Sequence, residues 1–320
     1  MNGFSGESPS LPGEDNPFRQ ASHASEAMAA IGTTPLHDRV WVVTGATSGI
    51  GKATALGLAR LGGTVVLACR DATRGGEAQQ EIVRDSKNPK VTLMIADLAS
   101  QASIASFAEE FTQDYRRLDA LVNNAGVYTR ERMTTPDGLE MQFAVNYLGG
   151  FLLSHLLLDL LLASTPARIV NVASSAHKGA KIDFDDLQGE RSYKGYRAYG
   201  QSKLAQILFT VEYGRRLAGT GVTVNAVHPG VIKTNLASGE IPKALRFVRM
   251  FFKSPAKGAE TPIFLVASPT VANLSGQYFV NRQVQAPSRE AQDPATARRL
   301  YDVSVKLAGL GADERGGTPP

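Results

Sequence analysis

A tyrosine and a lysine in the second half of the chain have the spacing that proton transfer requires. Tyr199 and Lys203 are four residues apart in a segment of helical period, so their side chains are expected on one helix face, one turn apart. A nearby ammonium group favours the phenolate and lowers the pKa of a tyrosine from about 10, which makes the phenol a usable general acid or base. The same pair also fits an exposed helix, so other residues must decide between the two interpretations.

A glycine-rich turn near the start of the chain has the composition of a phosphate-binding loop. Its residues are Gly45, Thr47, Ser48, Gly49, Ile50 and Gly51. Glycine permits a tight turn and a close approach of the backbone to a diphosphate, and a following helix offers unpaired N–H groups. The spacing G-x-x-x-G-x-G meets the general dinucleotide fingerprint only loosely. Its place between the first apolar run and the first helical segment favours dinucleotide binding over a plain turn.

The end of the second apolar run predicts which dinucleotide is preferred. An acidic residue there would bind the ribose 2′-hydroxyl of NAD, whereas an arginine accommodates the additional phosphate of NADP. The run ends in Cys69-Arg70, and Lys52 behind the glycine turn offers a second positive charge. These residues favour NADP over NAD. The alternative is that Arg70 is a solvated loop residue, and the neighbouring Asp71 supports that alternative.

The elements that must position these residues alternate along the chain as repeated βα units do. Runs rich in Val, Ile and Leu predict strands at 40–44, 64–69, 91–96, 120–123, 168–172, 222–227 and 277–280. Segments of helical period predict helices at 49–61, 73–86, 100–115, 138–163, 196–218, 256–268 and 294–310. The sequence therefore predicts an α/β fold, a single doubly wound domain of the Rossmann type over 37–310. Its expected core is a seven-stranded parallel sheet flanked by helices.

Composition excludes several other classes of protein. Among 320 residues, 34 Lys or Arg and 30 Asp or Glu give a net charge of +4 without an aromatic-interleaved basic patch, so no nucleic acid is expected as a partner. One cysteine excludes a disulfide framework and a cysteine zinc site, and the histidines lack metal-ligand spacing, so no metal is expected. The apolar run 148–162 contains His155 and Asp159 and falls short of the roughly 20 apolar residues of a membrane span.

The two ends of the chain differ in composition from the rest. Residues 1–36 are rich in Pro, Ser, Gly and acidic residues and contain no apolar core, so a disordered tail is expected there and not a signal or transit peptide. Residues 311–320 are expected to form a flexible C-terminal tail. The single cysteine suits a reducing compartment, and a cytoplasmic location is expected.

Together the motifs resemble those of the classical short-chain dehydrogenases/reductases. The motifs that occur in the order of that family are the glycine turn, Asn123-Asn124-Ala125-Gly126, Asn146, Ser174, the segment from Tyr199 to Lys203, and Pro229-Gly230. The likeness covers 37–310, and the coincidence of six separate spacings makes it specific. Segments 168–177, 186–190, 198–210 and 219–230 further resemble the retinol dehydrogenase-like branch.

The resemblance implies a catalytic tetrad of Asn146, Ser174, Tyr199 and Lys203. Ser174 would hold the substrate oxygen, Tyr199 would give or take the proton, and Lys203 would lower the tyrosine pKa and bind the ribose hydroxyls. Asn146 would hold a water in a proton relay to Lys203. Ser175 competes for the serine role, but Ser174 stands where the motif of the family has its serine.

The resemblance also implies cofactor contacts beyond the glycine turn and Arg70. They are Asp97, Leu98, Asn123, Ala125, Gly126, Pro229, Gly230, Ile232 and Thr234, with Tyr199 and Lys203. Two of them have structural alternatives, because Asp97 would cap the helix near Ser100 and Asn123 would tie neighbouring strands together. His177 is interpreted as structural, with contact to the substrate as the alternative.

The segment 235–256 is expected to cross the open end of the site. Basic residues recur there on one helical stripe opposite apolar residues. They are Lys243, Arg246, Arg249 and Lys253. One interpretation is a lid whose apolar face closes on a lipophilic carbonyl, and Pro242 favours it over a stable helix. The other is a membrane-surface helix over 241–253 whose basic residues meet anionic headgroups.

The sequence thus predicts an NADP-dependent oxidoreductase that transfers hydride between the nicotinamide and a small lipophilic carbonyl or alcohol of retinal, steroid or aromatic type. Tyr199 is its expected general acid or base. The alternative is a catalytically silent, dinucleotide-sensing binding protein, whose usual mark would be loss of the tyrosine or the lysine. A homodimer through the helices of Asn146 and Tyr199 stays open, as does peripheral membrane contact through 241–253.

Overall fold

The computed structural model describes residues 36–230 and 254–311, and within them the chain forms one eight-stranded sheet. The strands are β1 (Val40–Thr44), β2 (Thr64–Cys69), β3 (Val91–Ile95), β4 (Ala120–Asn123), β5 (Ala167–Val172), β6 (Val222–His228), β7 (Tyr278–Val280) and β8 (Gln283–Val284). Their order is β3-β2-β1-β4-β5-β6-β7-β8, and β1 to β7 pair in parallel. The predicted doubly wound α/β class is confirmed.

The sheet differs from the expected seven strands by the short strand β8. This strand pairs antiparallel with β7 across a two-residue turn, Asn281-Arg282, whose residues have φ values of 50° and 66°. Turns with positive φ at both central residues suit hairpins, because their twist matches that of the flanking strands. Two exposed residues are too few to show a hydrophobic period, so the sequence pattern did not predict β8.

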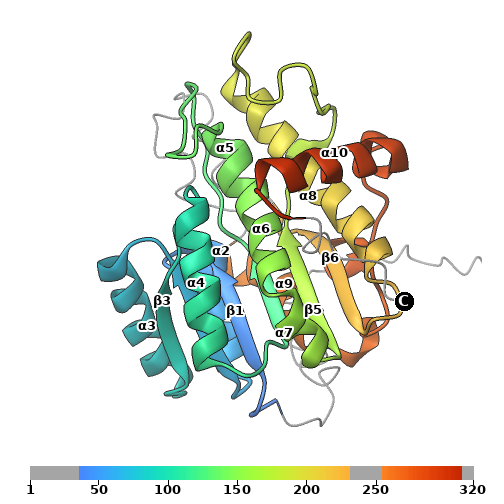
Figure 1. Ribbon diagram of the computed structural model, residues 1–320. Helices are drawn as coiled ribbons and strands as arrows, with labels where there is room; N and C mark the ends of the chain where they lie inside the picture. The colour runs from blue at the N-terminus through green and yellow to red at the C-terminus, as the bar shows by residue number, and fades with distance from the viewer. Residues whose placement is uncertain (1–35, 231–253, 312–320) are drawn as a thin grey trace, which may run out of the picture.

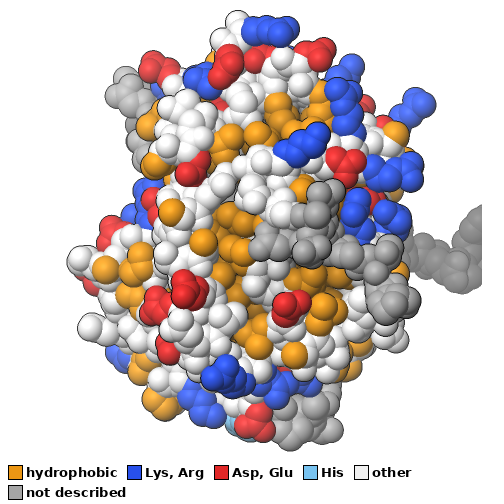
Figure 2. Space-filling view, viewed as in Figure 1, with side chains coloured by type: hydrophobic (Ala, Val, Ile, Leu, Met, Phe, Trp, Pro, Cys, Tyr) orange, Lys and Arg blue, Asp and Glu red, His pale blue; other side chains and the backbone are white. Residues whose placement is uncertain are grey.

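Helices cover both faces of the sheet (Figure 1). They are α2 (Gly49–Ala59), α3 (Ala72–Ser86), α4 (Gln101–Asp114), α5 (Met141–Phe143), α6 (Gly149–Leu156), α7 (Leu158–Ala163), α8 (Gly195–Arg216), α9 (Pro255–Ala267) and α10 (Pro294–Leu307). Helices α4, α6 and α8 lie on the face turned to the viewer in Figure 1, whereas α2 packs against α3 and α9 on the other face. Figure 2 shows hydrophobic side chains gathered along the centre of the near face, with charged side chains around them.

The central strands are mainly apolar because both faces of the sheet are covered. In β1, Val40 and Val42 belong to the core under α4, α6 and α8, whereas Trp41 and Val43 belong to the core on the other face. Successive strand residues point to opposite faces, so a strand between two helical layers needs apolar residues throughout. This burial holds the carboxyl ends of the strands in fixed register.

The prediction of a single helix over 138–163 is wrong in detail, because this segment is divided into several helical pieces. Helix α5 is followed by a π-helical turn at Ala144–Leu148, then by α6 and α7. A Cβ on Gly149 would come within 2.9 Å of the Leu98 carbonyl oxygen, so glycine lets α6 approach the end of the segment after β3. The π turn displaces the backbone at Asn146, and such turns are found mostly at functional sites.

Three sequence predictions concern segments that the structure does not describe. The N-terminal tail to residue 35 and the C-terminal tail from residue 312 lie outside the described residues, as does the lid up to residue 253. With them go Ile232, Thr234 and the basic stripe of the lid. Among the residues that are described, no helix is both long and apolar enough to cross a bilayer.

Candidate active site

A cleft of about 1100 Å³ runs along the carboxyl ends of β1, β2, β4, β5 and β6. It brings together residues that the sequence spreads over 185 positions, from Gly45 to Gly230. The predicted site residues that line it are Gly45, Thr47, Ser48, Gly49, Ile50, Gly51, Arg70, Asp97, Leu98, Ala125, Gly126, Ser174, Tyr199, Lys203, Pro229 and Gly230. Such a crevice, at the point where the strand order reverses, is where doubly wound sheets bind ligands.

Tyr199 and Ser174 meet at one end of this cleft. Ser174 follows β5 and lines the cleft together with Tyr199, which lies on the second turn of α8. Burial raises the pKa of Tyr199, and the interaction with the Ser174 hydroxyl acts in the opposite direction. The ring of Tyr128 stands edge-on to that of Tyr199 with 6.0 Å between the centroids. The phenol therefore lies near a hydroxyl and is shielded from water on one side.

Lys203 lies one turn beyond Tyr199 and is buried, with only 4% of its surface exposed. Its Nζ is 5.7 Å from the Tyr199 ring centroid and donates to the carbonyl oxygen of Val172 at 3.0 Å and to Oε1 of Gln206 at 2.8 Å. Burial lowers the pKa of Lys203 to about 7. The expected lowering of the tyrosine pKa by this lysine is thus not seen, because burial dominates both groups and Nζ is bonded elsewhere.

Asn146 lies behind the cleft, at the π turn, and does not line it. Its Oδ1 accepts from the N–H of Val127 at 2.7 Å, and its Nδ2 donates to the Val127 carbonyl at 3.1 Å and to Oγ of Ser202 at 2.9 Å. The Ser202 hydroxyl in turn donates to the carbonyl of Tyr199 at 2.8 Å. Asn146 therefore joins the segment after β4 to the helix of the tyrosine, and Ser202 is a positioning residue that the sequence analysis missed.

The glycine turn has the geometry that close approach to a phosphate requires. Gly45 and Gly49 have φ values of 65° and 59°, in the region that side chains disfavour. A Cβ on Gly45 would come within 2.8 Å of Ala125 Cα. Ser48 stands at the N-cap of α2 without a side-chain hydrogen bond to the helix, so the first N–H groups of α2 face the cleft uncapped. These residues fit a dinucleotide diphosphate.

Two polar residues that the sequence analysis did not single out fix this turn to β4. Oγ1 of Thr44 accepts from the N–H groups of Asn124 and Ala125 at 2.9 and 3.0 Å. The Asn124 side chain donates back to the Thr44 carbonyl at 2.9 Å. The link could not be predicted from Thr44 alone, because its hydroxyl bonds to the segment after β4, and the pairing of β1 with β4 is known only from the structure.

At the far end of the cleft the charged residues differ from those expected. Arg70 lines the cleft, and Arg74, on the first turn of α3, lines it as well. Asp71 lines the same end of the cleft, and as the N-cap of α3 its side chain accepts from the Arg74 N–H at 3.0 Å. The suggestion of Lys52 as a second cation is wrong, since its Nζ is paired with Glu81. Arg74 takes the place proposed for Lys52.

The structure decides between the alternatives at Asp97 and Asn123. Ser100, and not Asp97, is the N-cap of α4, and Asp97 lines the cleft while its Oδ1 accepts from the Ala99 N–H. Asn123 is turned away from the cleft, because its Nδ2 donates to Oδ1 of Asn171 at 2.9 Å and to Oγ of Ser154 at 3.1 Å. These contacts support the strand-tying interpretation for Asn123, which does not line the cleft.

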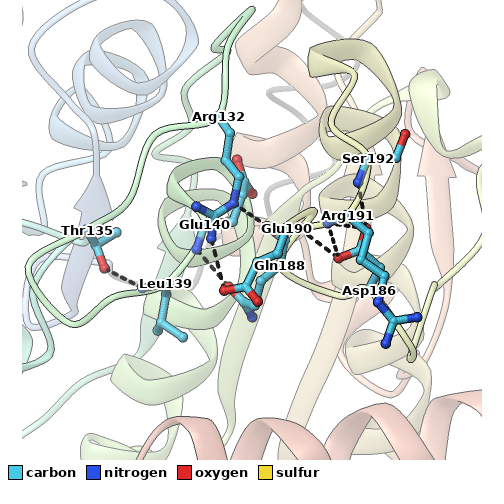
Figure 3. A network of polar contacts seen from close by, with 9 residues as sticks. All are labelled: Arg132, Thr135, Leu139, Glu140, Asp186, Gln188, Glu190, Arg191 and Ser192. Atoms are coloured by element: carbon cyan, nitrogen blue, oxygen red, sulfur yellow. Dashed lines mark hydrogen bonds and ion pairs between the residues drawn. The ribbon is translucent and has the colours of Figure 1, made fainter.

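The segment between β5 and α8 is held over the site by polar contacts with the segment after β4 (Figure 3). Asp186 accepts from the backbone N–H groups of residues 190 to 192. Arg132 donates to the Gln188 carbonyl at 2.9 Å, and Oε1 of Gln188 accepts from the Glu140 N–H at 2.7 Å. These contacts fix the path of the chain into α8, and with it the position of the first turns that carry the tyrosine.

The comparisons with known proteins agree with this geometry. The model of the short chain dehydrogenase family matches residues 39–244, which is more than half of the chain. The chain belongs to the short-chain dehydrogenase family. Mouse (Mus musculus) retinol dehydrogenase 13 is 48% identical over 278 residues, with 84% of this chain and 83% of that protein covered. Human retinol dehydrogenase 14 is 43% identical over 294 residues, with 86% and 88% covered.

A solved structure extends the match to the fold. The Pseudomonas aeruginosa RhlG/NADP active-site complex has a TM-score of 0.61 and 26% identity, with 78% of this chain and 97% of that chain covered. The curated relatives put this short-chain dehydrogenase in the retinol dehydrogenase-like branch of the family. It is an NAD(P)-dependent oxidoreductase.

The substrate end of this dehydrogenase contains further residues beside the predicted tetrad. Tyr128, Ser175, Tyr196 and His228 line the cleft beside the Ser174–Tyr199 pair. Tyr196 is 68% exposed at the mouth of the cleft, and a large exposed aromatic ring indicates a binding surface. The sequence does not show that this ring is exposed, so it could not be identified without the structure. His177 does not line the cleft, so the structural interpretation is the correct one for it.

Proposed function

We propose that this dehydrogenase interconverts a small lipophilic carbonyl compound and its alcohol with NADP(H), and that Tyr199 is the general acid or base. The observation that carries the proposal is the placement of Ser174, Tyr199 and Lys203 in the same cleft as the glycine turn. A silent binding protein would have no use for a buried phenol and a hydroxyl beside a buried lysine.

The chain's own residues have separate tasks in the reaction. The glycine turn and the N-terminus of α2 would hold the diphosphate, and the nicotinamide supplies or takes the hydride when it is bound. Ser174 orients the substrate oxygen by a hydrogen bond, and Tyr199 donates a proton to that oxygen during reduction or accepts it during oxidation. Lys203, buried one turn away, would bind the ribose hydroxyls of the cofactor. Asn146 and Ser202 keep the two segments in register.

The preference for NADP over NAD rests on two arginines. Arg70 and Arg74 both line the end of the cleft that follows β2. Guanidinium groups bind phosphate oxygens in a fixed geometry, whereas an acid at the end of β2 would be needed to bind the 2′-hydroxyl of NAD. The RhlG structure, titled as an NADP complex, is consistent with this preference.

A lipophilic substrate is supported by the relatives and by the cleft. The curated relatives are named retinol dehydrogenases, and the rings of Tyr128 and Tyr196 flank the reacting end of the cleft. Retinal, steroid ketones and aromatic aldehydes are therefore the compounds to test. The lid over 235–256 and the surface helix over 241–253 are further proposals, for residues that lie mostly outside the described part of the chain. We also propose a cytoplasmic location.

Turnover by wild-type protein and by Tyr199→Phe tests the proposal directly. With NADPH and a panel of retinal, steroid and aromatic carbonyls, we expect wild-type turnover with at least one compound and a loss of at least about 100-fold in kcat for Tyr199→Phe. NADPH binding, followed by calorimetry, should persist in the variant. Tyr115→Phe is the matched control, since the phenol of Tyr115 lies at the end of α4 and bonds to Thr92. Tight NADPH binding without any turnover would favour the binding-protein alternative.

A further inference from the structure

His177 is fully buried, and both of its ring nitrogens are hydrogen-bonded. Nδ1 lies 2.6 Å from the carbonyl oxygen of Ser174, and Nε2 accepts from the backbone N–H of Ser288 at 3.1 Å. None of its surface is exposed, and its ring packs edge-on against that of Tyr278 in β7, with 5.2 Å between the centroids. One imidazole therefore connects the segment of the serine with a segment 111 residues further along the chain.

The two partners determine the tautomer of this histidine. A carbonyl oxygen only accepts, so Nδ1 must carry the proton, and a backbone N–H only donates, so Nε2 must be the bare nitrogen. Burial lowers the pKa of His177, which favours the neutral ring that this pairing needs. The ring is thus held in one orientation from two sides.

The contacts of the serine make that orientation relevant to the site. Ser174 lines the cleft with Tyr199, and its Oγ accepts from the Ala176 N–H at 3.2 Å. The next N–H, of Ser175, donates to Nδ1 of His228 at 3.3 Å. The Ser174 carbonyl accepts both from the ring of His177 and, at 3.3 Å, from the backbone N–H of His177. Rotation of the Ser174–Ser175 peptide would break these contacts together.

We propose that His177 is a positioning residue that fixes the Ser174 hydroxyl, and that the C-terminal segment at Ser288 holds His177 in place. This inference rests on the proposed function, because it assigns Ser174 to the substrate oxygen. It gives the segment after β8 an indirect effect on the site through His177, because none of the residues at 287–292 lines the cleft. A displacement of about 1 Å at a reacting group costs up to about 100-fold in rate.

Three substitutions of His177 separate hydrogen bonding from packing. Asn places an N–H near the position of Nδ1 and can keep the bond to the Ser174 carbonyl. Gln reaches toward the Ser288 N–H but places no donor at the position of Nδ1. Phe fills the space and makes neither hydrogen bond. We expect kcat to fall by about 10- to 100-fold in His177→Phe and His177→Gln, with the KM for NADPH changed less than threefold, and to be restored partly in His177→Asn. Losses in kcat that follow the melting temperatures of the three variants, regardless of donor, would overturn the proposal.

The second half of the link is tested at Ser288. Ser288→Pro removes the N–H that Nε2 accepts, whereas Ser288→Ala keeps it and serves as the matched control. We expect the proline variant to lower kcat in the same way as His177→Phe, and the alanine variant to leave kcat within about twofold. Equal activity of the two Ser288 variants would contradict the role of the C-terminal segment.

A measurement without turnover keeps this inference apart from the proposed function. In wild-type protein with ¹⁵N-labelled histidine, long-range ¹H–¹⁵N correlation reports the tautomer, and the signal that His177→Asn removes is that of His177 among five histidines. We expect a neutral ring protonated at Nδ1. A ring protonated at Nε2 would sink the inference, even in an active enzyme. If no carbonyl is turned over although the Nδ1 tautomer is found, the proposed function fails while the structural link stands.

Discussion

At the scale of single residues, Lys203 combines a catalytic assignment with a cost in stability. Its ammonium group is buried and bonded to two neutral oxygens, of Val172 and Gln206, with no carboxylate among these partners. Removing such a charge from water is unfavourable, which is why burial lowers its pKa to about 7. The site therefore keeps a group that weakens the folded state.

This cost predicts that Lys203→Met stabilises the protein while it abolishes turnover. We expect a gain of about 1–2 kcal/mol, or about 2–8 °C in melting temperature. Below a pH of about 7 the lysine is charged in both states and the gain is largest. As the pH rises from about 7 to 10.5, only the unfolded state stays protonated, so wild-type stability rises and the gain shrinks. Thermal melts of both proteins over this range check the sign, and a gain that grows with pH would refute it.

The two arginines after β2 predict the cofactor preference of the enzyme. We expect Arg70→Ala/Arg74→Ala to weaken NADPH binding by about 10- to 100-fold and to leave NADH binding within about twofold, because only NADPH has the additional phosphate. Titration of each dinucleotide by calorimetry measures the ratio. Arg84→Ala is the control, since Arg84 is on the same helix and pairs with Asp85 at the surface. An equal loss for both dinucleotides would argue against a phosphate contact.

At the scale of elements, α10 is joined to α6 by a buried hydrogen bond. Nδ1 of His155 lies 2.7 Å from the Phe151 carbonyl, so Nε2 is the acceptor for the hydroxyl of Tyr301 at 2.8 Å. Burial lowers the pKa of His155 to about 4. The guanidinium of Arg216 at the end of α8 stacks on the other side, 3.7 Å from the Tyr301 ring. One tyrosine thus connects α10 with two helices of the near face.

Tyr301→Phe is expected to destabilise the fold by about 1–3 kcal/mol, because the buried Nε2 of His155 loses its donor. Chemical unfolding with urea measures the change. The double variant with His155→Leu should cost less than the sum of the single variants, since both act on one bond. Strictly additive costs would show that the hydrogen bond is not the cause.

The sequence predicted the regular elements of the sheet well and the irregular ones poorly. Strands β1, β2 and β4 begin and end where the apolar runs do, because burial on both faces leaves no polar position inside them. The interruption of the helix at Asn146 was missed, since the amide that causes it bonds to Val127 on another segment. Strand β8 was missed for want of length.

The candidate site shows the same division. The tetrad and the glycine turn lie near one cleft because their spacing follows from the strand and helix junctions, which are local. Arg74 and Tyr128 belong to no motif, and Ser202 lies within the tyrosine motif without a role assigned to it. Lys52 was misjudged because its partner Glu81 lies on a different helix. Contacts between distant segments are what a sequence alone leaves open.

At the scale of the whole molecule, the C-terminal helix closes the near face of the domain. Helix α10 packs along α8, whose side chains from Ser202 to Thr210 are all buried (Figure 1). Leu300, Tyr301 and Val305 form the apolar side of α10. An association of two chains through the outward side of α8 would have to displace this helix.

Removal of α10 is expected to make the protein self-associate. A chain that ends at Asp293 would expose the apolar side of α8 to water, and large exposed apolar patches drive association. Light scattering after size exclusion should give a larger mass for this chain than for one that ends at residue 311, which retains α10. If both chains run as the same species and melt at the same temperature, α10 has no such covering role.

The reversal of strand order beside the glycine turn also bears on how the chain acquires its fold. Strand β1 pairs with β4, and the hydrogen bond from Asn124 to the Thr44 carbonyl joins residues 80 positions apart. Parallel strand pairings over this sequence separation form slowly, because the entropy of closing a long loop is lost before the stabilising contacts form. The dinucleotide site therefore arises only after the two halves of the sheet have joined. A bound dinucleotide comes too late to speed folding, and its kinetic effect is to slow unfolding.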